Sequence, residues 1–315
     1  MMTSLICGSL AYDTLMSFPE RFSESLLADQ LHNINVCFLV PRMRREFGGC
    51  AGNIAYNLKL LGGRPLVMAT IGMDGSPYLE RLAELDISRR HIRTIKTTYT
   101  AQAFITTDKN NNQITAFHPG AMALSHENRI EDTTGEDIQL AIVAPDGRDG
   151  MLQNANDCAR LGIPFIFDPG QQLPLFNREE LRHFIDLATY VAVNEYEAEM
   201  LAQLSEWSVA DITSHVEAFI VTCAERGAVI YRQGEKLDIP CVKAEKEADP
   251  TGCGDAFRAG LMYGLTRGLD MATCGRLGSL MGAIKIEYAG PQNHKLTAQE
   301  IADRFEKAFG YRYQQ

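Results

Sequence analysis

The chain has 315 residues, of which 45% are hydrophobic and 22% are charged, and its formal net charge is −10. This composition is typical of a globular protein and excludes a disordered or fibrous chain. The negative charge argues against nucleic acid or a membrane as a partner, because broad surfaces for both need positive charge. It does not argue against a phosphate-containing substrate, which the N-terminus of a helix can hold.

Eight cysteines are scattered along the chain, without a Cys-x-x-Cys pair or a zinc-like spacing of cysteine and histidine. Several lie in apolar runs, as expected for reduced, buried thiols in a reducing compartment. No apolar run approaches the ~18–20 residues that a membrane span needs. The first residues also lack the basic region of a signal peptide. We therefore expect a cytoplasmic protein.

Short apolar runs alternate with longer amphipathic stretches along most of the chain. The apolar runs predict strands at 5–7, 66–71, 138–143, 164–167, 190–193, 218–222 and 228–231. The amphipathic stretches predict helices at 51–61, 78–85, 179–187, 196–204, 254–267, 271–288 and 298–309, and one that ends near residue 161. This alternation is typical of a mostly parallel sheet with helices on both faces. Ligands of such sheets bind beyond the carboxyl ends of the strands.

Two regions, 13–47 and 91–118, interrupt this alternation. Polar and apolar residues alternate in both, which favours strands with one solvated face, and the three asparagines at 110–112 suit a hairpin turn. We interpret the two regions together as a small β lid, and residues 1–12, 48–90 and 119–315 as one large α/β domain. A pair of ordinary surface hairpins is the alternative. An open lid edge can pair with a second chain, so both a monomer and a lid-mediated homodimer fit the sequence.

The strongest motif is Asp-Pro-Thr-Gly-Cys-Gly-Asp at 249–255, directly before a predicted helix. Gly252 and Gly254 allow a tight turn that presents N–H groups, at a helix N-terminus where the helix dipole also favours an anion. Such an anion hole suits the oxygens of a phosphoryl group during transfer. Asp255 is placed to accept a proton from an attacking hydroxyl. Taken alone, the motif is equally consistent with a simple capped loop.

A second glycine motif, Phe-Gly-Gly-Cys-Ala-Gly-Asn at 47–53, precedes an earlier predicted helix. Glycines such as Gly49 let a ligand approach the backbone closely. The Asn53 side chain can both donate to and accept from sugar hydroxyls. The alternative is a glycine turn with a capping asparagine.

Two further motifs follow predicted strands in the second half of the chain. Asn194 and Glu197 come after the strand at 190–193, where an amide and a carboxylate can organise a hydrated Mg²⁺. The alternative there is a helix start with favourable acidic residues. Thr222 ends another strand, and the loop from it to Gly227 could contact the phosphate or ribose of a nucleotide. A turn between two strands is the alternative.

The four motifs in this order are more specific than any one of them. The chain resembles the ribokinase-type (PfkB) carbohydrate and nucleoside kinase family over essentially its whole length, and the two glycine motifs match that family's N-terminal and C-terminal signatures. The segments 48–57, 117–122 and 249–255 look like the adenosine and nucleoside kinase branch. The resemblance implies a ribokinase-like three-layer α/β/α fold with a mostly parallel central sheet and a small β-sheet lid.

The resemblance also implies site residues for phosphoryl transfer, for the acceptor and for ATP. Phosphoryl transfer would use Asp255 with the backbone of Gly252, Cys253 and Gly254, and the acceptor would be bound by Asp13, Gly49 and Asn53. The residues for ATP would be Asn194, Glu197, Thr222, Gly227 and Asn293. Asp255 would be the catalytic base, Asn293 would lie near the adenine, and Glu197 would contact Mg²⁺ indirectly. A requirement for a monovalent cation is left open.

Two departures from the family's pattern affect these expectations. Cys253 stands where alanine is commoner, and a thiol at a helix N-terminus can have a lowered pKa and be sensitive to oxidation. A small residue that simply fits is the favoured interpretation. The segment 168–171, Asp-Pro-Gly-Gln, differs from the Asp-Pro-Asn that is usual in sugar kinases, which weakens a simple sugar-kinase assignment.

We therefore expect an ATP-dependent kinase that phosphorylates the 5′-hydroxyl of adenosine or a related nucleoside. One alternative is a sugar kinase that acts on a primary hydroxyl of ribose, fructose or a relative. Another is a catalytically inactive ligand-binding protein on the same fold, against which the intact Asp255 and both glycine motifs argue.

Overall fold

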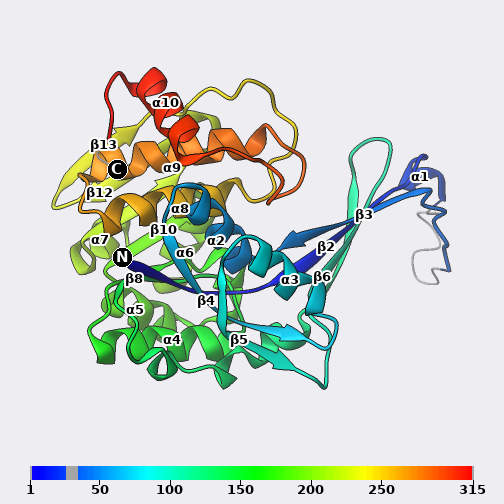
Figure 1. The fold of residues 1–315 in the computed structure, drawn as a ribbon, viewed down its shortest axis with the longest axis horizontal. Helices are drawn as coiled ribbons and strands as arrows, with labels where there is room; N and C mark the ends of the chain where they lie inside the picture. Colours follow the sequence, from blue (N-terminus) through cyan, green and yellow to red (C-terminus); the bar gives the residue numbers. More distant parts are fainter. Residues whose placement is uncertain (1, 26–34, 314–315) are drawn as a thin grey trace.

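The computed structural model describes residues 2–25 and 35–313 of the chain. Figure 1 shows a layered α/β body and a smaller sheet that projects from it. Within the described residues, no helix is both long enough and apolar enough to cross a membrane.

The body is built on a nine-stranded sheet with the order β13-β12-β11-β10-β9-β8-β1-β4-β5. Its strands are β1 (Thr3–Cys7), β4 (Arg64–Gly72), β5 (Ser88–Ile95), β8 (Ile138–Val143), β9 (Phe165–Phe167), β10 (Tyr190–Asn194), β11 (Ala218–Thr222), β12 (Ala228–Arg232) and β13 (Glu235–Ile239). The strands from β5 to β11 pair in parallel, whereas β12 and β13 extend one edge in antiparallel fashion. The predicted mostly parallel sheet is confirmed.

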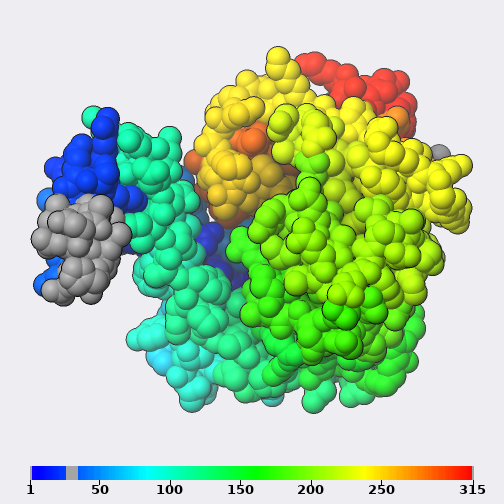
Figure 2. All heavy atoms as spheres, turned by 180° about the vertical axis from the view of Figure 1, so that it is seen from behind, coloured from blue at the N-terminus to red at the C-terminus, as the bar shows by residue number. Residues whose placement is uncertain are grey.

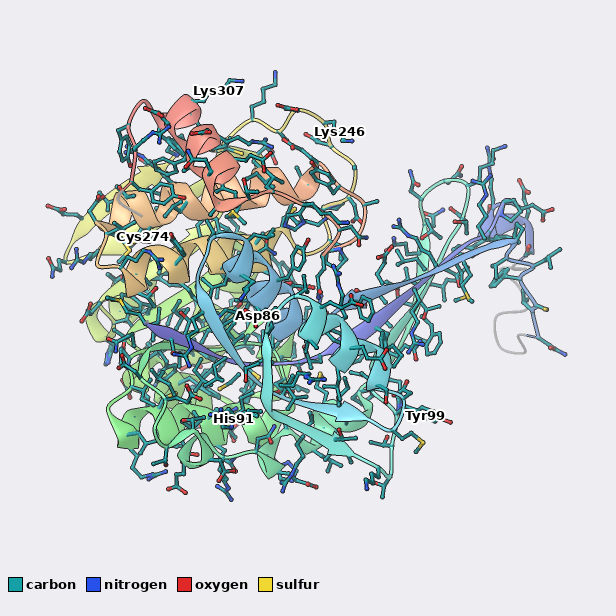
Figure 3. All side chains as sticks on the ribbon, viewed as in Figure 1. Asp86, His91, Tyr99, Lys246, Cys274 and Lys307 are labelled. Atoms are coloured by element: carbon teal, nitrogen blue, oxygen red, sulfur yellow. The ribbon has the colours of Figure 1, made fainter. Side chains whose placement is uncertain are left out.

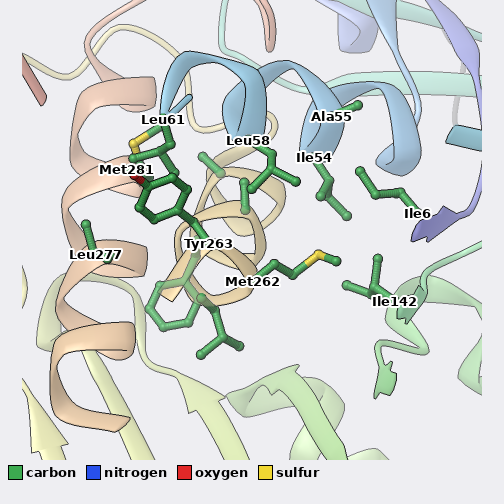
Figure 4. Packing of buried hydrophobic residues seen from close by; sticks show 14 of the residues in the cluster. Ile6, Ile54, Ala55, Leu58, Leu61, Ile142, Met262, Tyr263, Leu277 and Met281 are labelled. Carbon is green, nitrogen blue, oxygen red and sulfur yellow. The ribbon is translucent and has the colours of Figure 1, made fainter. Parts of the chain in front are cut away.

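Helices cover both faces of this sheet, so the body has the predicted three layers. One face carries α2 (Cys50–Leu60), α3 (Ser76–Glu84), α8 (Cys253–Thr266), α9 (Met271–Ile286) and α10 (Ala298–Phe309), and the other carries α4 (Arg148–Leu161), α5 (Arg178–Leu187), α6 (Glu195–Ser205) and α7 (Val209–His215). A hydrophobic core lies on each face of the sheet: the first under α2, α3, α8, α9 and α10, and the second under the other four helices. Successive strand side chains point to opposite faces, so Ile6 of β1 lies in the first core, and Leu5 and Cys7 lie in the second. Figure 4 shows the first core, where Ile54 of α2 and Met262 of α8 pack near Ile6.

A second, four-stranded sheet projects from the body (Figure 1). This small sheet has the order β3-β2-β6-β7. It consists of β2 (Ala11–Ser17), β3 (Arg42–Gly48), β6 (Ala101–Thr107) and β7 (Gln113–His118), and the short helix α1 (Phe22–Ser25) follows β2. Figure 2 shows a hollow between the small sheet and the body, with dark-blue atoms from the start of the chain at its bottom.

The small sheet differs from the predicted lid at the start of both segments: its first strand begins at Ala11, two residues earlier than predicted, and its second segment begins at Ala101, later than the predicted residue 91. Residues 91–95, predicted to lie in the lid, belong to β5, which pairs with β4 at the edge of the large sheet. Most of β5 is exposed, and an edge strand with a solvated face has the same alternating pattern as a lid strand. Part of the predicted lid region 13–47, residues 26–34, lies outside the described residues. The division of the chain into two domains stays a prediction.

Candidate active site

Helices α2 and α8 begin beside each other, which brings the two glycine motifs together. Asn53, near the start of α2, donates a hydrogen bond from Nδ2 to Oδ2 of Asp255, in the first turn of α8, at 2.8 Å. The two residues are 202 positions apart in the chain, so this contact depends on the fold. A residue predicted to bind the acceptor thus lies one hydrogen bond from the predicted catalytic base.

Two glycines make these helix starts possible. Gly49 and Gly252 have left-handed backbones, with φ of 84° and 82°. A Cβ at Gly49 would lie 2.5 Å from the carbonyl oxygen of Ser9, and a Cβ at Gly252 would lie 2.8 Å from a neighbouring proline side chain. Both positions therefore need glycine. Gly254 differs, because it lies within α8 and a Cβ there would meet its nearest neighbour at an ordinary 3.6 Å. Gly254 is exposed, so it leaves open space over the helix N-terminus and is not needed for the turn.

The N-terminus of α8 supplies the N–H groups of the predicted anion hole. Those of Gly254 and Asp255 lie in the first turn, where N–H groups have no partner within the helix and the helix dipole favours an anion. The N–H of Cys253 instead donates to the carbonyl of Pro250 at 3.2 Å. One of the three predicted backbone donors is therefore engaged in the turn that leads into the helix.

Asp249 holds this turn in place. Its carboxylate accepts hydrogen bonds from the N–H of Thr251 at 2.9 Å and from the N–H of Gly290 at 2.8 Å. Burial opposes ionisation, but these N–H donors outweigh it and lower the pKa of Asp249. Arg44 of the small sheet lies 3.7 Å from the same carboxylate. The loop before α8 is thus fixed to the loop around Gly290 and lies against β3.

The environment of Asp255 is suited to a base. Burial raises the pKa of Asp255 to about 7, and the charge of Asp168 adds to the rise, whereas the hydrogen bond from Asn53 and the charge of Arg258 oppose it. A carboxyl group with a pKa near neutrality can accept a proton and still be ionised at physiological pH.

A buried ion pair supports the start of α8. Nε and Nη2 of Arg258 each lie 3.1 Å from a carboxylate oxygen of Asp168, and Nη2 also donates to the carbonyl of Ala192 at 3.1 Å. The two charged side chains are only 5% and 6% exposed. Bidentate pairs of this kind are directional, so Arg258 fixes α8 against the residue that follows β9 and against the middle of β10. Arg258 also lies 3.9 Å from Glu197.

A chain of hydrogen bonds among buried side chains orients Asn53. Nε2 of Gln292 donates to Oδ1 of Asn53 at 3.0 Å and to the hydroxyl of Tyr78 at 2.9 Å. Tyr78 in turn donates to the carbonyl of Gly48 at 2.7 Å. Because the oxygen of Asn53 accepts from Gln292, its nitrogen must face Asp255. Gln292 and Tyr78 belong to none of the four motifs, so the sequence did not reveal this role.

Asp13 faces the anion-hole loop from the small sheet. Burial raises its pKa to about 6, with further contributions from the charges of Glu46 and Asp249, so the three carboxylates lie near one another. Asn293, predicted near the adenine, donates from Nδ2 to Oε2 of Glu46 at 2.8 Å. The structure therefore places Asn293 beside the small sheet, on the side where Asp13 would meet the acceptor.

The other residues predicted for ATP lie at the carboxyl ends of β10 and β11. Asn194 and Thr222 are register partners there, and Asn194 and Glu197 close a capping box on α6 through two hydrogen bonds of 2.8 Å. The carbonyl of Gly227 accepts from the N–H of Cys223 at 2.7 Å in the turn to β12. The structural roles considered as alternatives are thus present, and the side chain of Asn194 is still exposed.

The thiol of Cys253 is not activated by the helix N-terminus. Burial raises the pKa of Cys253 to about 11, although the charge of Lys285 opposes this rise. The pKa is therefore raised and not lowered, because desolvation of the thiolate is the largest effect on it. The structure favours the simpler interpretation of a small residue that fits.

The layered fold, with the two glycine motifs side by side at the starts of α2 and α8, is the one expected of an α/β phosphotransferase. The family model described as pfkB family carbohydrate kinase matches residues 10–298, and the chain belongs to this family. The predicted class, a phosphotransferase with an alcohol group as acceptor, is thereby confirmed.

Relatives resemble the chain over nearly its whole length. It is 33% identical to a nucleoside kinase of Methanocaldococcus jannaschii, over 87% of this chain and 90% of the relative. The crystal structure of the nucleoside kinase from that organism superposes with a TM-score of 0.88 at 31% identity, covering 98% of this chain and 99% of the other. The structure of Burkholderia thailandensis nucleoside kinase in complex with inosine has a TM-score of 0.90 at 54% identity, covering 98% and 100%.

Proposed function

We propose that the protein transfers the γ-phosphate of ATP to the 5′-hydroxyl of a nucleoside, with Asp255 as the catalytic base. The observation that carries this proposal is the position of Asp255 at the N-terminus of α8, hydrogen-bonded to Asn53 at 2.8 Å and next to the exposed Gly254. The similarity to a nucleoside kinase whose structure contains inosine, and in a second structure ADP with inosine, supports a nucleoside as the acceptor.

Three parts of the site have different roles in the proposed reaction. Asp13 and Asn53 bind hydroxyls of the acceptor and orient the 5′-hydroxyl towards Asp255, which takes its proton as the bond to phosphorus forms. The N–H groups at the start of α8 donate hydrogen bonds to the phosphoryl oxygens and stabilise the negative charge that builds up on them. On closing over the hollow that Figure 2 shows, the small sheet would exclude water and so limit wasteful hydrolysis of ATP.

The chain has residues that fit a hydrated Mg²⁺ carried by ATP. Within the described residues, no group of three or more His, Cys, Asp or Glu side chains could hold a metal ion by itself. Mg²⁺ usually keeps several waters and binds through one or two carboxylates together with phosphates. Glu197, whose side chain is 13% exposed, would hold such an ion through water, beside Asn194. When bound, Mg²⁺ would neutralise part of the charge of the phosphates.

The proposal is tested by measuring ADP release from ATP and Mg²⁺ with a panel of acceptors. We expect turnover with inosine and adenosine and little with free ribose or fructose. Turnover of free sugars without any nucleoside would favour the sugar-kinase alternative. Binding of a nucleoside without turnover of any acceptor would favour the inactive ligand-binding protein.

The small sheet offers an aromatic side chain that a nucleobase would use and a free sugar would not. Asp13 of β2 pairs with Ala103 of β6, which pairs with Phe117 of β7, so the three side chains lie in one row on one face. Phe117 is 52% exposed. We infer that the base of the nucleoside stacks on Phe117 while Asp13 holds the ribose.

The variant Phe117→Ala should lower kcat/KM for inosine about 5- to 150-fold, since stacking of a base is worth about 1–3 kcal/mol. Phe104→Ala is the matched control, because Phe104 is also exposed but lies on the opposite face of the same sheet. Steady-state kinetics of both variants decide the matter. Equal losses in the two variants, or none in Phe117→Ala, would contradict the stacking role.

The pH dependence of kcat/KM should follow the ionisation of Asp255. The base must be ionised, so kcat/KM should fall as pH drops below about 7, the raised pKa of Asp255. Asn53→Leu removes a hydrogen bond that lowers this pKa, so the acidic limb of the profile should move to higher pH, in addition to any loss of substrate binding. A limb that stays near pH 4 in the wild type, or does not move in the variant, would argue against Asp255 as the titrating group.

A further inference from the structure

A lysine is completely buried behind the anion hole. Lys285, in the last turn of α9, is 0% exposed. Its Nζ donates to the carbonyl of Asp249 at 2.6 Å and to the carbonyl of Tyr288 at 3.1 Å. Lysine is almost never fully buried unless its charge is compensated. This side chain therefore has a role beyond solubility.

The two carbonyls come from the two loops that form the site. Asp249 belongs to the loop that leads into α8, and Tyr288 belongs to the loop that continues to Gly290 and Gln292. Those loops are also joined by the N–H of Gly290, which donates to the carboxylate of Asp249 at 2.8 Å. Lys285 thus joins two loops. One positions the anion-hole donors, and the other carries Gln292, which orients the base through Asn53.

The charges around Lys285 fit a buried cation. Desolvation lowers its pKa, and the charges of Asp249 and Glu46 oppose this effect, while that of Arg44 adds to it. The carboxylate of Asp249 supplies compensating charge in the same loop. An ammonium held by backbone carbonyls is also chemically close to a bound monovalent cation, because carbonyl oxygens can replace the hydration shell of K⁺.

We propose that Lys285 is a built-in cation, which holds the anion-hole loop by its carbonyls as a bound K⁺ or NH₄⁺ could, so that catalysis does not require an added monovalent cation. The inference rests on the proposed kinase function. Lys285 acts as a positioning residue, since it contacts the backbone of the loops and not the reacting atoms.

The wild-type protein gives the first test. Turnover of inosine with ATP and Mg²⁺ is measured in KCl and in tetramethylammonium chloride at equal ionic strength, because the larger cation cannot enter a carbonyl site. We expect equal rates and equal melting temperatures in the two salts. A wild-type protein that is active only in KCl would overturn the inference. Absence of turnover in both salts would count against the proposed function instead, and the melting temperatures would still test the inference.

The variant Lys285→Met gives the second test, because it keeps an unbranched side chain only one atom shorter and removes the charged Nζ. We expect kcat to fall at least about tenfold, as displacement of catalytic groups by about 1 Å can cost 10²-fold. KCl or NH₄Cl, but not tetramethylammonium chloride, should restore part of kcat and raise the melting temperature. Unchanged kcat, or a loss that neither salt repairs, would overturn the inference.

Lys246→Met is the matched control. Lys246 is exposed on the surface loop before the anion hole (Figure 3), and its Nζ lies 5.7 Å from the ring of Tyr288. The variant removes a positive charge close to the same loop and leaves the contacts of Lys285 with the carbonyls of Asp249 and Tyr288 in place. Its kcat should match that of the wild type in both salts. If Lys246→Met also gained a K⁺-dependent rate, the effect would be one of general charge, which would contradict the specific role of Lys285.

Should Lys285→Met fail to fold, the comparison of salts with the wild-type protein still decides the inference.

Discussion

Replacing Asp255 with Asn should lower kcat about 10²- to 10⁴-fold, the usual contribution of a general base, while ATP still binds. Asn keeps the shape of the side chain, and its Oδ1 can still accept the hydrogen bond that Asn53 donates at 2.8 Å. The amide cannot take a proton from the acceptor hydroxyl. Removing a carboxylate from the N-terminus of α8 also removes repulsion of the phosphates, so the affinity for ATP should be unchanged or higher.

The measurement combines single-turnover kinetics with calorimetric titration of ATP, so that chemistry and binding are separated. Asp86→Asn is the matched control. Asp86 is a highly exposed carboxylate that pairs with Lys59, in the last turn of α2 and so at the opposite end of that helix from Asn53. Its left-handed backbone, with φ of 52°, is one that Asn also adopts readily. Near-normal turnover by Asp255→Asn would show that another group is the base. Loss of ATP binding would point to a structural role.

Breaking the buried ion pair should have the largest effect on stability. Arg258→Met leaves the carboxylate of Asp168 buried without its partner, and such a change costs about 3–5 kcal/mol of unfolding free energy. The side chains are 5% and 6% exposed, so water cannot replace the missing guanidinium. Equilibrium denaturation by urea measures this loss, with turnover recorded for the fraction that remains folded.

The double variant Arg258→Met/Asp168→Leu distinguishes the effect of an unpaired buried charge on stability from the effect of altered packing. Removing both charges should recover most of the lost stability, because a buried pair costs desolvation energy as well as supplying attraction. Arg312→Met removes the shared partner of two exposed ion pairs and should change stability far less. A single variant as stable as the wild type, or a double variant no more stable than Arg258→Met, would contradict this account of the pair.

Elements with a strong apolar pattern could be predicted from the sequence. The strands at 138–143 and 218–222 and the helix at 298–309 have the predicted bounds, because their buried faces are continuous. The strand β13, Glu235–Ile239, was not predicted, since four of its five residues are at least partly exposed and only Ile239 is buried. The helix α7 buries Ile212 alone. Short edge elements of this kind are defined by their neighbours and carry little signal of their own.

The candidate site was predictable where its residues lie in glycine motifs. Asp255 and Asn53 are in such motifs, and their contact follows once α2 and α8 lie side by side. Arg258, Gln292 and Lys285 act across distances of 36 to 239 positions in the chain. A single arginine, glutamine or lysine on an amphipathic helix or loop has no local pattern, so only the fold reveals the partners of these three side chains.

The most direct test of the account is the identity of the phosphorylated product. Purified protein is incubated with ATP, Mg²⁺ and inosine, and the products are analysed by phosphorus and proton NMR. We predict inosine 5′-monophosphate and ADP in equal amounts, with phosphorus coupled to the two protons on the 5′-carbon. ADP accompanied by inorganic phosphate, or a phosphate on another hydroxyl, would contradict the placement of the 5′-hydroxyl between Asp255 and the N-terminus of α8.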